Sequence, residues 1–226
     1  MNKKLIVCGC SFSAPSKPLP GTAYGEVLAK KLGWDVEILA RQGCSNGGIR
    51  VQIDEVLRQR PAFAIIAPTF HDRMEIPASA APYVPPREEN KGWNSDLQKH
   101  LQHSHLNGYS KDAGIDNVID RTTQQAMKQY VNFLYDSEWK RQQDEWIIRD
   151  GIMQLYYSGI PFLLVANNLW TSNTVREAIP MVVPDKYMTL EFEQTPAYAT
   201  NTYPFTGEDP GYHGDPKSQE YLADVY

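Results

Sequence analysis

Short apolar runs and amphipathic stretches alternate over the first part of the chain. The runs are rich in Ile, Val, Leu and Ala, which is typical of strands buried on both faces of a parallel sheet. The stretches between them repeat apolar residues at three- and four-residue spacing, as helices do when they pack on a sheet. The pattern predicts strands at 5–8, 36–40 and 62–67, a helix at 24–32, and a second helix between the loop at 43–48 and Pro61.

The later part of the chain predicts a long helical region at about 118–158 with a break near Asp136 and Ser137, a strand at 160–166 and a terminal helix at 216–226. The second half of the long helical region places four large side chains on one stripe, which we expect to face the core. These residues are Trp139, Trp146, Met153 and Tyr156.

Residues 74–117 differ in character, because clustered prolines are followed by charged and His- and Asn-rich sequence. We interpret this segment as a polar insertion or lid, since the strand at 160–166 still belongs to the sheet that begins upstream. Strands that alternate with helices predict the α/β class. We therefore expect a single domain over 1–226, with a three-layer α/β/α arrangement, a parallel sheet and a flavodoxin-like appearance.

The composition excludes several classes of protein. The chain has 226 residues, of which 42% are hydrophobic, and this is enough for one domain with a sizeable core. Its net charge of -5 argues against nonspecific binding to nucleic acid or to an anionic membrane, both of which need a basic surface. The apolar runs are far shorter than the roughly 20 residues of a membrane-spanning helix. We expect neither nucleic acid nor membrane as a partner.

The cysteines and the first residues indicate a cellular compartment. Cys8, Cys10 and Cys44 are odd in number and form no CxxC pair, which favours reduced thiols over disulfides or a structural zinc site. Two lysines near the start precede an apolar stretch that ends at Gly9, too early for a signal peptide. We therefore expect this stretch to be the first strand of a cytoplasmic protein.

Two groups of residues suggest other chemistry. A thiol at Cys10 would be a stronger nucleophile than a serine, but alternation along a strand turns it away from the side that Ser11 faces. We expect Cys10 and Cys44 to be small buried packing residues. The histidines of HLQHSH at 100–105 lie in polar sequence without clear periodicity, which favours a solvated loop over a metal site. We expect no metal and no other cofactor.

Polar segments follow several of the predicted strands. Ser11 follows the first strand, the Gly43 loop follows the second, the segment 69–72 follows the third and Asn167 follows the strand at 160–166. In parallel α/β sheets, binding sites form at the carboxyl ends of the strands. We expect these segments to converge at one edge of the sheet.

These segments resemble the scattered motif blocks of the SGNH (GDSL-like) hydrolases. GCSFS at 9–13 is similar to the first block, with Cys10 in place of its usual Asp, and Gly43 matches the glycine of the second block. PTFHD at 68–72 stands where the third block has its asparagine, which is missing here. DPGYH at 209–213 resembles the Asp-x-x-His block with one residue more. GCSF at 9–12 and GCSN at 43–46 also resemble motifs of an uncharacterised SGNH branch that is common in tailed-virus genomes.

The resemblance implies a catalytic triad of Ser11 as nucleophile, His213 as general base and Asp209 as the acid that orients the imidazole. Each role has a plainer alternative. Ser11 is also a typical helix N-cap, and a lone histidine in a loop is usually a surface residue. Asp215 is the other candidate for the triad acid, although its place before Pro216 is typical of a helix cap.

The resemblance also implies an oxyanion hole made of the backbone N–H groups of Ser11 and Gly43 and one side chain. Without the block-three asparagine, the side chain must come from Thr69, His71 or Asn46, or be absent. We expect Arg73 and Glu75 to bind a charged group of the substrate. The alternatives are a packed or exposed His71 and a surface ion pair for Arg73 and Glu75.

The sequence therefore predicts a serine esterase that forms an acyl-enzyme. The polar insertion favours O-acyl esters of a carbohydrate or of a small polar molecule as substrates. A binding or structural protein that kept the fold without activity is one alternative, favoured by the altered third and last blocks. Acyl transfer with the same residues is another, since it differs from hydrolysis only in how well water is excluded.

Overall fold

The computed structural model contains a parallel sheet with the strand order β2-β1-β3-β6-β7. It describes residues 3–15, 20–41, 44–71, 73–77, 101–105, 121–165, 188–189 and 216–226. The strands of this sheet are β1 (Lys4–Cys8), β2 (Asp35–Ile38), β3 (Phe63–Ile66), β6 (Phe162–Val165) and β7 (Met188–Thr189). Every neighbouring pair among them is parallel, which confirms the predicted α/β class.

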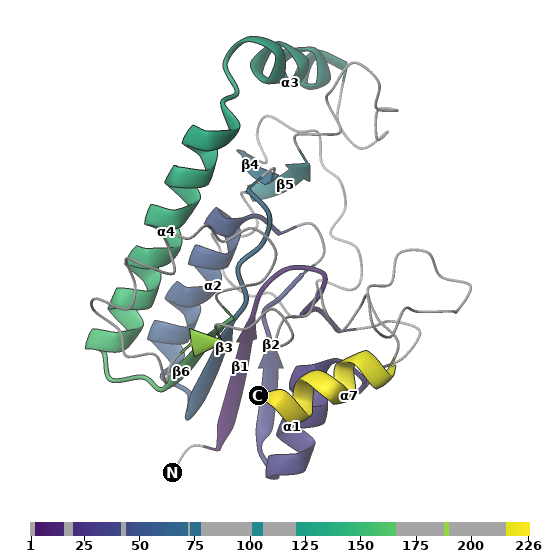
Figure 1. Ribbon diagram of the computed structural model, residues 1–226, viewed down its shortest axis with the longest axis vertical. Coiled ribbons are helices and arrows are strands. Elements are labelled where there is room, and N and C mark those ends of the chain that lie inside the picture. The colour runs from purple at the N-terminus through teal and green to yellow at the C-terminus, as the bar shows by residue number, and fades with distance from the viewer. Residues whose placement is uncertain are drawn as a thin grey trace.

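Helices cover both faces of this sheet (Figure 1). Helices α2 (Asn46–Gln59) and α4 (Ser137–Tyr157) lie on one face, and α1 (Tyr24–Leu32) and α7 (Pro216–Val225) lie on the other. Helix α3 (Arg121–Phe133) lies beyond the carboxyl ends of the strands and covers neither face. Alternate residues of β1 enter two separate cores: Ile6 and Cys8 pack towards α2 and α4, and Leu5 and Val7 pack towards α1 and α7. This strict alternation on a buried strand produces the three layers that the sequence predicts.

Helix ends are set by local signals in the sequence. Gly33 adopts φ 65° after α1, and its N–H lies against the carbonyl oxygens of the last turn. Ser45 is the N-cap of α2, and its Oγ accepts a hydrogen bond from the N–H of Gly48. Asp136 caps α4 by accepting a hydrogen bond from the N–H of Trp139 at 2.7 Å. The break between α3 and α4 therefore lies where the sequence predicts it.

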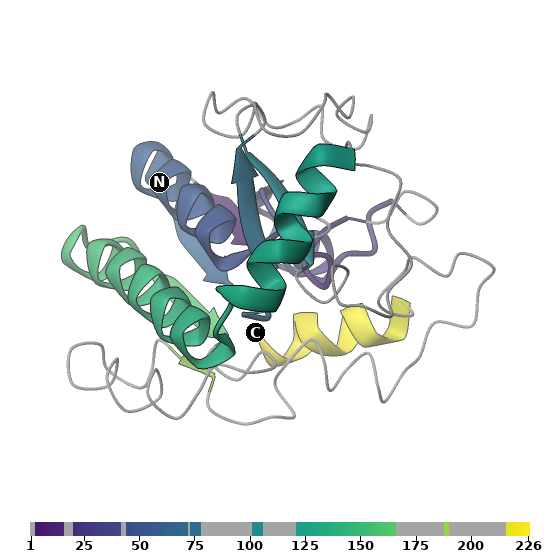
Figure 2. The same ribbon diagram turned by 90° about the horizontal axis from the view of Figure 1, so that it is seen from above.

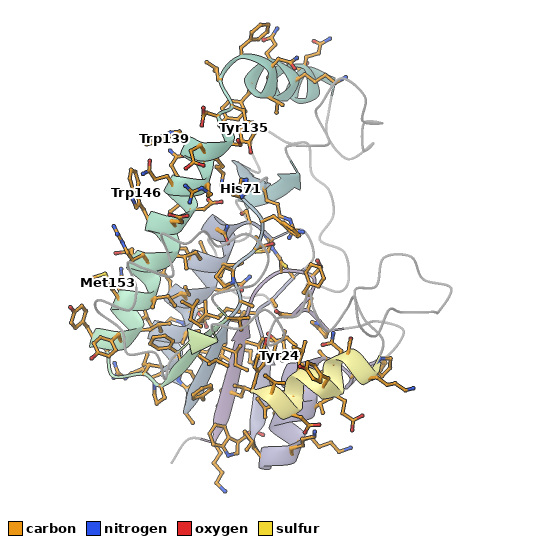
Figure 3. All side chains as sticks on the ribbon, in the orientation of Figure 1. Tyr24, His71, Tyr135, Trp139, Trp146 and Met153 are labelled. Atoms are coloured by element: carbon orange, nitrogen blue, oxygen red, sulfur yellow. The ribbon has the colours of Figure 1, made fainter. Side chains whose placement is uncertain are left out.

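The buried stripe of α4 differs from the prediction. Ile148, Ile152 and Leu155 enter the core, whereas Trp139 and Trp146 remain 50% and 44% exposed and pack edge to face against each other (Figure 3). The reason is the close approach of α2, since a Cβ added at Gly151 would lie 2.8 Å from Cδ1 of Ile53. The helix contact forms around this glycine, so the expectation that the tryptophans face the core was wrong.

A second, two-stranded sheet begins one residue before the segment 74–117 that was predicted as a polar insertion and otherwise lies within it. Strands β4 (Arg73–Pro77) and β5 (Leu101–His105) pair in antiparallel register, and they lie beyond the carboxyl ends of the main strands (Figures 1 and 2). His103 and His105 therefore lie on a strand rather than in the loop that we expected. That 1–226 form a single domain, with this segment as its insertion, stays a prediction.

No described helix is long and apolar enough to cross a membrane. No group of three or more His, Cys, Asp and Glu residues in the described part of the chain is arranged to hold a metal ion.

Candidate active site

Ser11 lies in the turn that follows β1, at the carboxyl edge of the sheet. The N–H of Ser13 donates a hydrogen bond to the carbonyl oxygen of Cys10 at 3.0 Å and so closes this turn. Gly9 leads into it, and a Cβ there would lie 2.7 Å from Oγ of Ser13 and 3.2 Å from the carbonyl oxygen of Ala67. The glycine is therefore required for the close approach of the turn to the segment after β3. Strands β1 and β3 are neighbours at the point where the strand order reverses, which is where ligands bind in such folds.

Ser13 and Ser11 have different surroundings. Ser13 is 1% exposed, and its Oγ accepts a hydrogen bond from the hydroxyl of Tyr24 at 2.9 Å. Ser11 is only half-buried. Burial raises the pKa of Tyr24, so this hydroxyl keeps its proton and remains a donor at ordinary pH. Ser13 is thus a structural residue of the turn, and Ser11 is the more exposed of the two serines.

The cysteines beside Ser11 are packing residues, as the sequence predicts. Cys10 and Cys44 are fully buried in the core between the sheet and helices α2 and α4. Cys8 is also fully buried, and burial raises the pKa of its thiol. Buried thiols of this kind are poor nucleophiles, because the reactive species is the thiolate.

Gln52 of α2 fixes the backbone of Gly9 from both sides. The N–H of Gly9 donates a hydrogen bond to Oε1 of Gln52 at 2.6 Å, and Nε2 of Gln52 donates to the carbonyl oxygen of Gly9 at 3.2 Å. The same Nε2 lies 3.2 Å from Sγ of Cys44. The side chain is fully buried, so these bonds are not exchanged with water. The path of the chain into the Ser11 turn is thereby set by α2.

Asn46, the first residue of α2, makes the same kind of contact with Thr69 after β3. The N–H of Thr69 donates to Oδ1 of Asn46 at 2.8 Å, and Nδ2 of Asn46 donates to the carbonyl oxygen of Thr69 at 2.9 Å. Nδ2 also donates to Oδ2 of Asp144 on α4 at 3.1 Å. An amide nitrogen carries two hydrogens, so in this geometry Asn46 has none left for an oxyanion.

Thr69 and His71 are the other predicted side-chain donors of the oxyanion hole. Thr69 is 4% exposed, and its Oγ1 has no hydrogen-bond partner among the described residues. His71 is half-buried and lies above the carboxyl ends of the strands, close to β4 (Figure 3). Both residues therefore stay candidates.

Arg73 begins β4 and lies inside the protein rather than on its surface. It is 3% exposed, and its Nη1 donates a hydrogen bond to the carbonyl oxygen of Cys44 at 3.1 Å. Its guanidinium carbon lies 5.5 Å from the centre of the Phe70 ring. Its Nε has no hydrogen-bond partner in the described part of the chain. The surface ion pair that the sequence left open for Arg73 is excluded, and the side chain of Glu75 lies outside the described residues.

Several predicted site residues lie outside the described residues, namely Gly43, Asp209, His213 and Asp215. The described chain resumes at α7, three residues after His213. Helix α7 is held against α1, because the N–H of Tyr24 donates to Oε1 of Gln219 at 2.9 Å and Lys31 pairs with Asp224 at 2.5 Å. The helix that follows the predicted base is therefore anchored to the helix that follows the Ser11 turn.

Gln52, Asp144 and Tyr24 were missed by reasoning from sequence. Gln52 lies beside Ile53 on the apolar stripe of α2, and Asp144 lies one turn before Ile148 on the buried stripe of α4. A polar residue on an apolar stripe was a usable signal, because a buried polar side chain nearly always has a hydrogen-bond partner.

Comparisons with known proteins give a likeness in fold. No family model and no curated protein matches the sequence. A protein assigned to the G-D-S-L lipolytic family from Desulfitobacterium hafniense DCB-2 is similar over 100% of both chains, with a TM-score of 0.49 and 11% identity. The acetyl xylan esterase AlAXEase (TM-score 0.49, 10% identity) covers 98% of this chain and 96% of its own. TesA (TM-score 0.47, 14% identity) covers 98% of this chain and 94% of its own.

Proposed function

We propose that this protein is a serine esterase of the SGNH type, which hydrolyses an O-acyl ester of a carbohydrate or small polar molecule through an acyl-enzyme on Ser11. One observation carries the proposal. Of the three nucleophilic side chains in the described segment 10–13, Cys10 is buried in the core, Ser13 is bonded to Tyr24, and Ser11 is half-buried in a turn fixed by α2.

In the proposed reaction, His213 accepts the proton of Ser11 as Oγ attacks the ester carbonyl carbon. The negative charge that develops on the carbonyl oxygen is stabilised by the N–H groups of Ser11 and Gly43 and by the hydroxyl of Thr69. The tetrahedral intermediate then expels the alcohol, which takes the proton from His213. Water, activated by the same imidazole, attacks the acyl group and releases the acid, while Asp209 orients the imidazole. No cofactor takes part.

The proposed substrate carries a polar or acidic group near the ester. Arg73 supports this part of the proposal. Its guanidinium is buried and its Nε–H has no hydrogen-bond partner among the described residues, and such a group favours carboxylate or phosphate oxygens. Glu75 would select a donor group on the same substrate. All three cysteines are buried and form no disulfide, which suits a reducing compartment such as the cytoplasm.

The test is covalent labelling with a fluorophosphonate, which reacts with activated serines. We expect one label on wild-type protein, located on Ser11 by peptide mass spectrometry. Ser11→Ala should lose the label while keeping the wild-type circular dichroism spectrum. Ser13→Ala is the matched control and should keep the label on Ser11. A label that persists in Ser11→Ala, on Ser13 or Cys10, overturns the assignment.

An inactive binding protein of the same fold is the second candidate. The specific observation in its favour is that the asparagine of the third block is missing and that both hydrogens of the nearby amide of Asn46 are already donated. Loss of one oxyanion donor typically costs about 10²–10³ in rate. Wild-type protein that neither takes the fluorophosphonate label nor hydrolyses aryl acetates would establish this alternative.

A further inference from the structure

Two amide side chains of α2 bind the backbone of two different loops at the carboxyl edge. The amide of Gln52 accepts a hydrogen bond from the N–H of Gly9 and donates one to its carbonyl oxygen. The amide of Asn46 makes the same two hydrogen bonds with the backbone of Thr69. Each amide acts as a neighbouring strand would, satisfying both backbone groups of one residue. Gly9 follows β1 and Thr69 follows β3, so one helix sets the backbone at the ends of two neighbouring strands.

The orientation of the Asn46 amide is fixed by a buried charge. The carboxylate of Asp144 accepts hydrogen bonds only, so the Nδ2 side of the amide must face it. Oδ1 is then left for the N–H of Thr69. Lys140, one turn earlier on α4, donates to the other oxygen of Asp144 and balances its charge. Asn46, Thr69 and Asp144 are each 4% exposed and Lys140 is 8% exposed.

We propose that Asn46 and Asp144 are positioning residues for the reaction, which hold Thr69 so that its hydroxyl meets the developing oxyanion. This inference rests on the proposed esterase function. Oγ1 of Thr69 is buried and has no partner among the described residues, although a donor left unused in the interior is costly. A donor fixed in advance needs no reorganisation when charge develops, and its stabilising effect depends on position to within about 0.5 Å. The chain Lys140–Asp144–Asn46 supplies that rigidity from α4.

The experiment separates positioning from stability by exchanging the two groups. In Asn46→Asp, two carboxylates meet in the interior and the carbonyl of Thr69 loses its donor. The double variant Asn46→Asp/Asp144→Asn again has a single buried carboxylate, as wild type does. The new amide at position 144 donates a hydrogen bond to the new carboxylate at position 46. The N–H of Thr69 keeps an acceptor, but its carbonyl still has no donor.

We expect Asn46→Asp to melt earlier and to hydrolyse an aryl acetate more slowly. The double variant should regain most of the melting temperature, while its kcat stays about 10- to 100-fold below wild type, because a small misplacement of a transition-state donor costs about this much. Its KM should stay within about twofold of the wild-type value. The Ser11 labelling rate should fall in parallel with kcat.

Ile152→Val is the matched control, since it weakens the packing of α4 on α2 without touching the amide. It should lower the melting temperature and leave kcat unchanged. A double variant that regains wild-type kcat together with its melting temperature overturns the positioning role, and so does an Asn46→Asp protein with wild-type kcat. If wild-type protein neither hydrolyses esters nor takes the label, the proposed function itself fails and this inference with it.

Discussion

The hydroxyl of Tyr24 donates a hydrogen bond to Oγ of Ser13 at 2.9 Å, and this bond joins α1 to the turn that carries Ser11. The backbone N–H of Tyr24 donates to Gln219 on α7, and its ring packs edge to face on Tyr226 at 5.3 Å. One buried residue thus links the candidate nucleophile to the helix that follows the predicted base.

Tyr24→Phe should lower the free energy of unfolding by about 1–3 kcal/mol, because Oγ of Ser13 would remain buried without its donor. The pKa of Tyr24 is raised by burial above its ordinary value of 10.0. The hydroxyl is therefore protonated in both folded and unfolded protein at lower pH, and the difference between wild type and variant should be constant there. It should shrink above about pH 10, where the unfolded tyrosine ionises and the folded one does not.

Urea unfolding at about pH 6, 8 and 10.5 measures this difference. Tyr157→Phe is the control, since this tyrosine is 71% exposed and should unfold like wild type. A difference that already declines between pH 6 and pH 8 would show that another group titrates with the bond.

Asp209 and Asp215 should give opposite results when each is replaced. Asp209→Asn should lose most turnover, as orienting acids of triads do, with little change in melting temperature. Asp215→Ala should lose about 0.5–2 kcal/mol as a helix cap, with near-normal turnover at low temperature. Thermal melting and ester hydrolysis of both variants decide between them. Loss of turnover in Asp215→Ala alone would make Asp215 the triad acid.

Glu145→Gln should stabilise the protein at neutral pH. Burial raises the pKa of Glu145, and this effect exceeds the opposing hydrogen bond and charge of Arg141. A carboxyl whose folded pKa is raised favours folding below its unfolded pKa and loses that advantage as pH rises through the folded pKa. The variant should therefore match wild type near pH 4 and exceed it near pH 7, as measured by urea unfolding.

Glu138→Gln is the control, because its effect on stability at neutral pH should have the opposite sign. The hydrogen bond from Arg141 lowers the pKa of Glu138, so its contribution is present above the unfolded pKa and is lost as pH falls. This exposed variant should be slightly less stable than wild type near pH 7 and equal to it in acid. If Glu145→Gln is instead the less stable protein at pH 7, the bond to Arg141 outweighs the burial.

Local sequence patterns predicted the order of the main strands and helices and several of their ends, but not β4, β5 or β7. β1 and α1 follow the predicted ranges closely, Gly33 ends α1, and the break before α4 falls at Asp136. These features depend on neighbours within a few residues, such as an apolar run, a capping oxygen or a glycine with positive φ. Interactions between residues so close in the sequence can be recognised without knowing the tertiary structure.

The buried face of α4 and the partners of the polar residues of α2 depend on contacts between segments that are far apart in the sequence. Trp146 and Ile148 are both apolar, and the core takes Ile148 because α2 approaches at Gly151. In sequence, Asn46 was a candidate oxyanion donor, yet its amide is committed to Thr69, 23 positions away, and to Asp144, 98 positions away. Partners so distant are brought together only when the sheet and both helices have packed, so no local pattern could assign them.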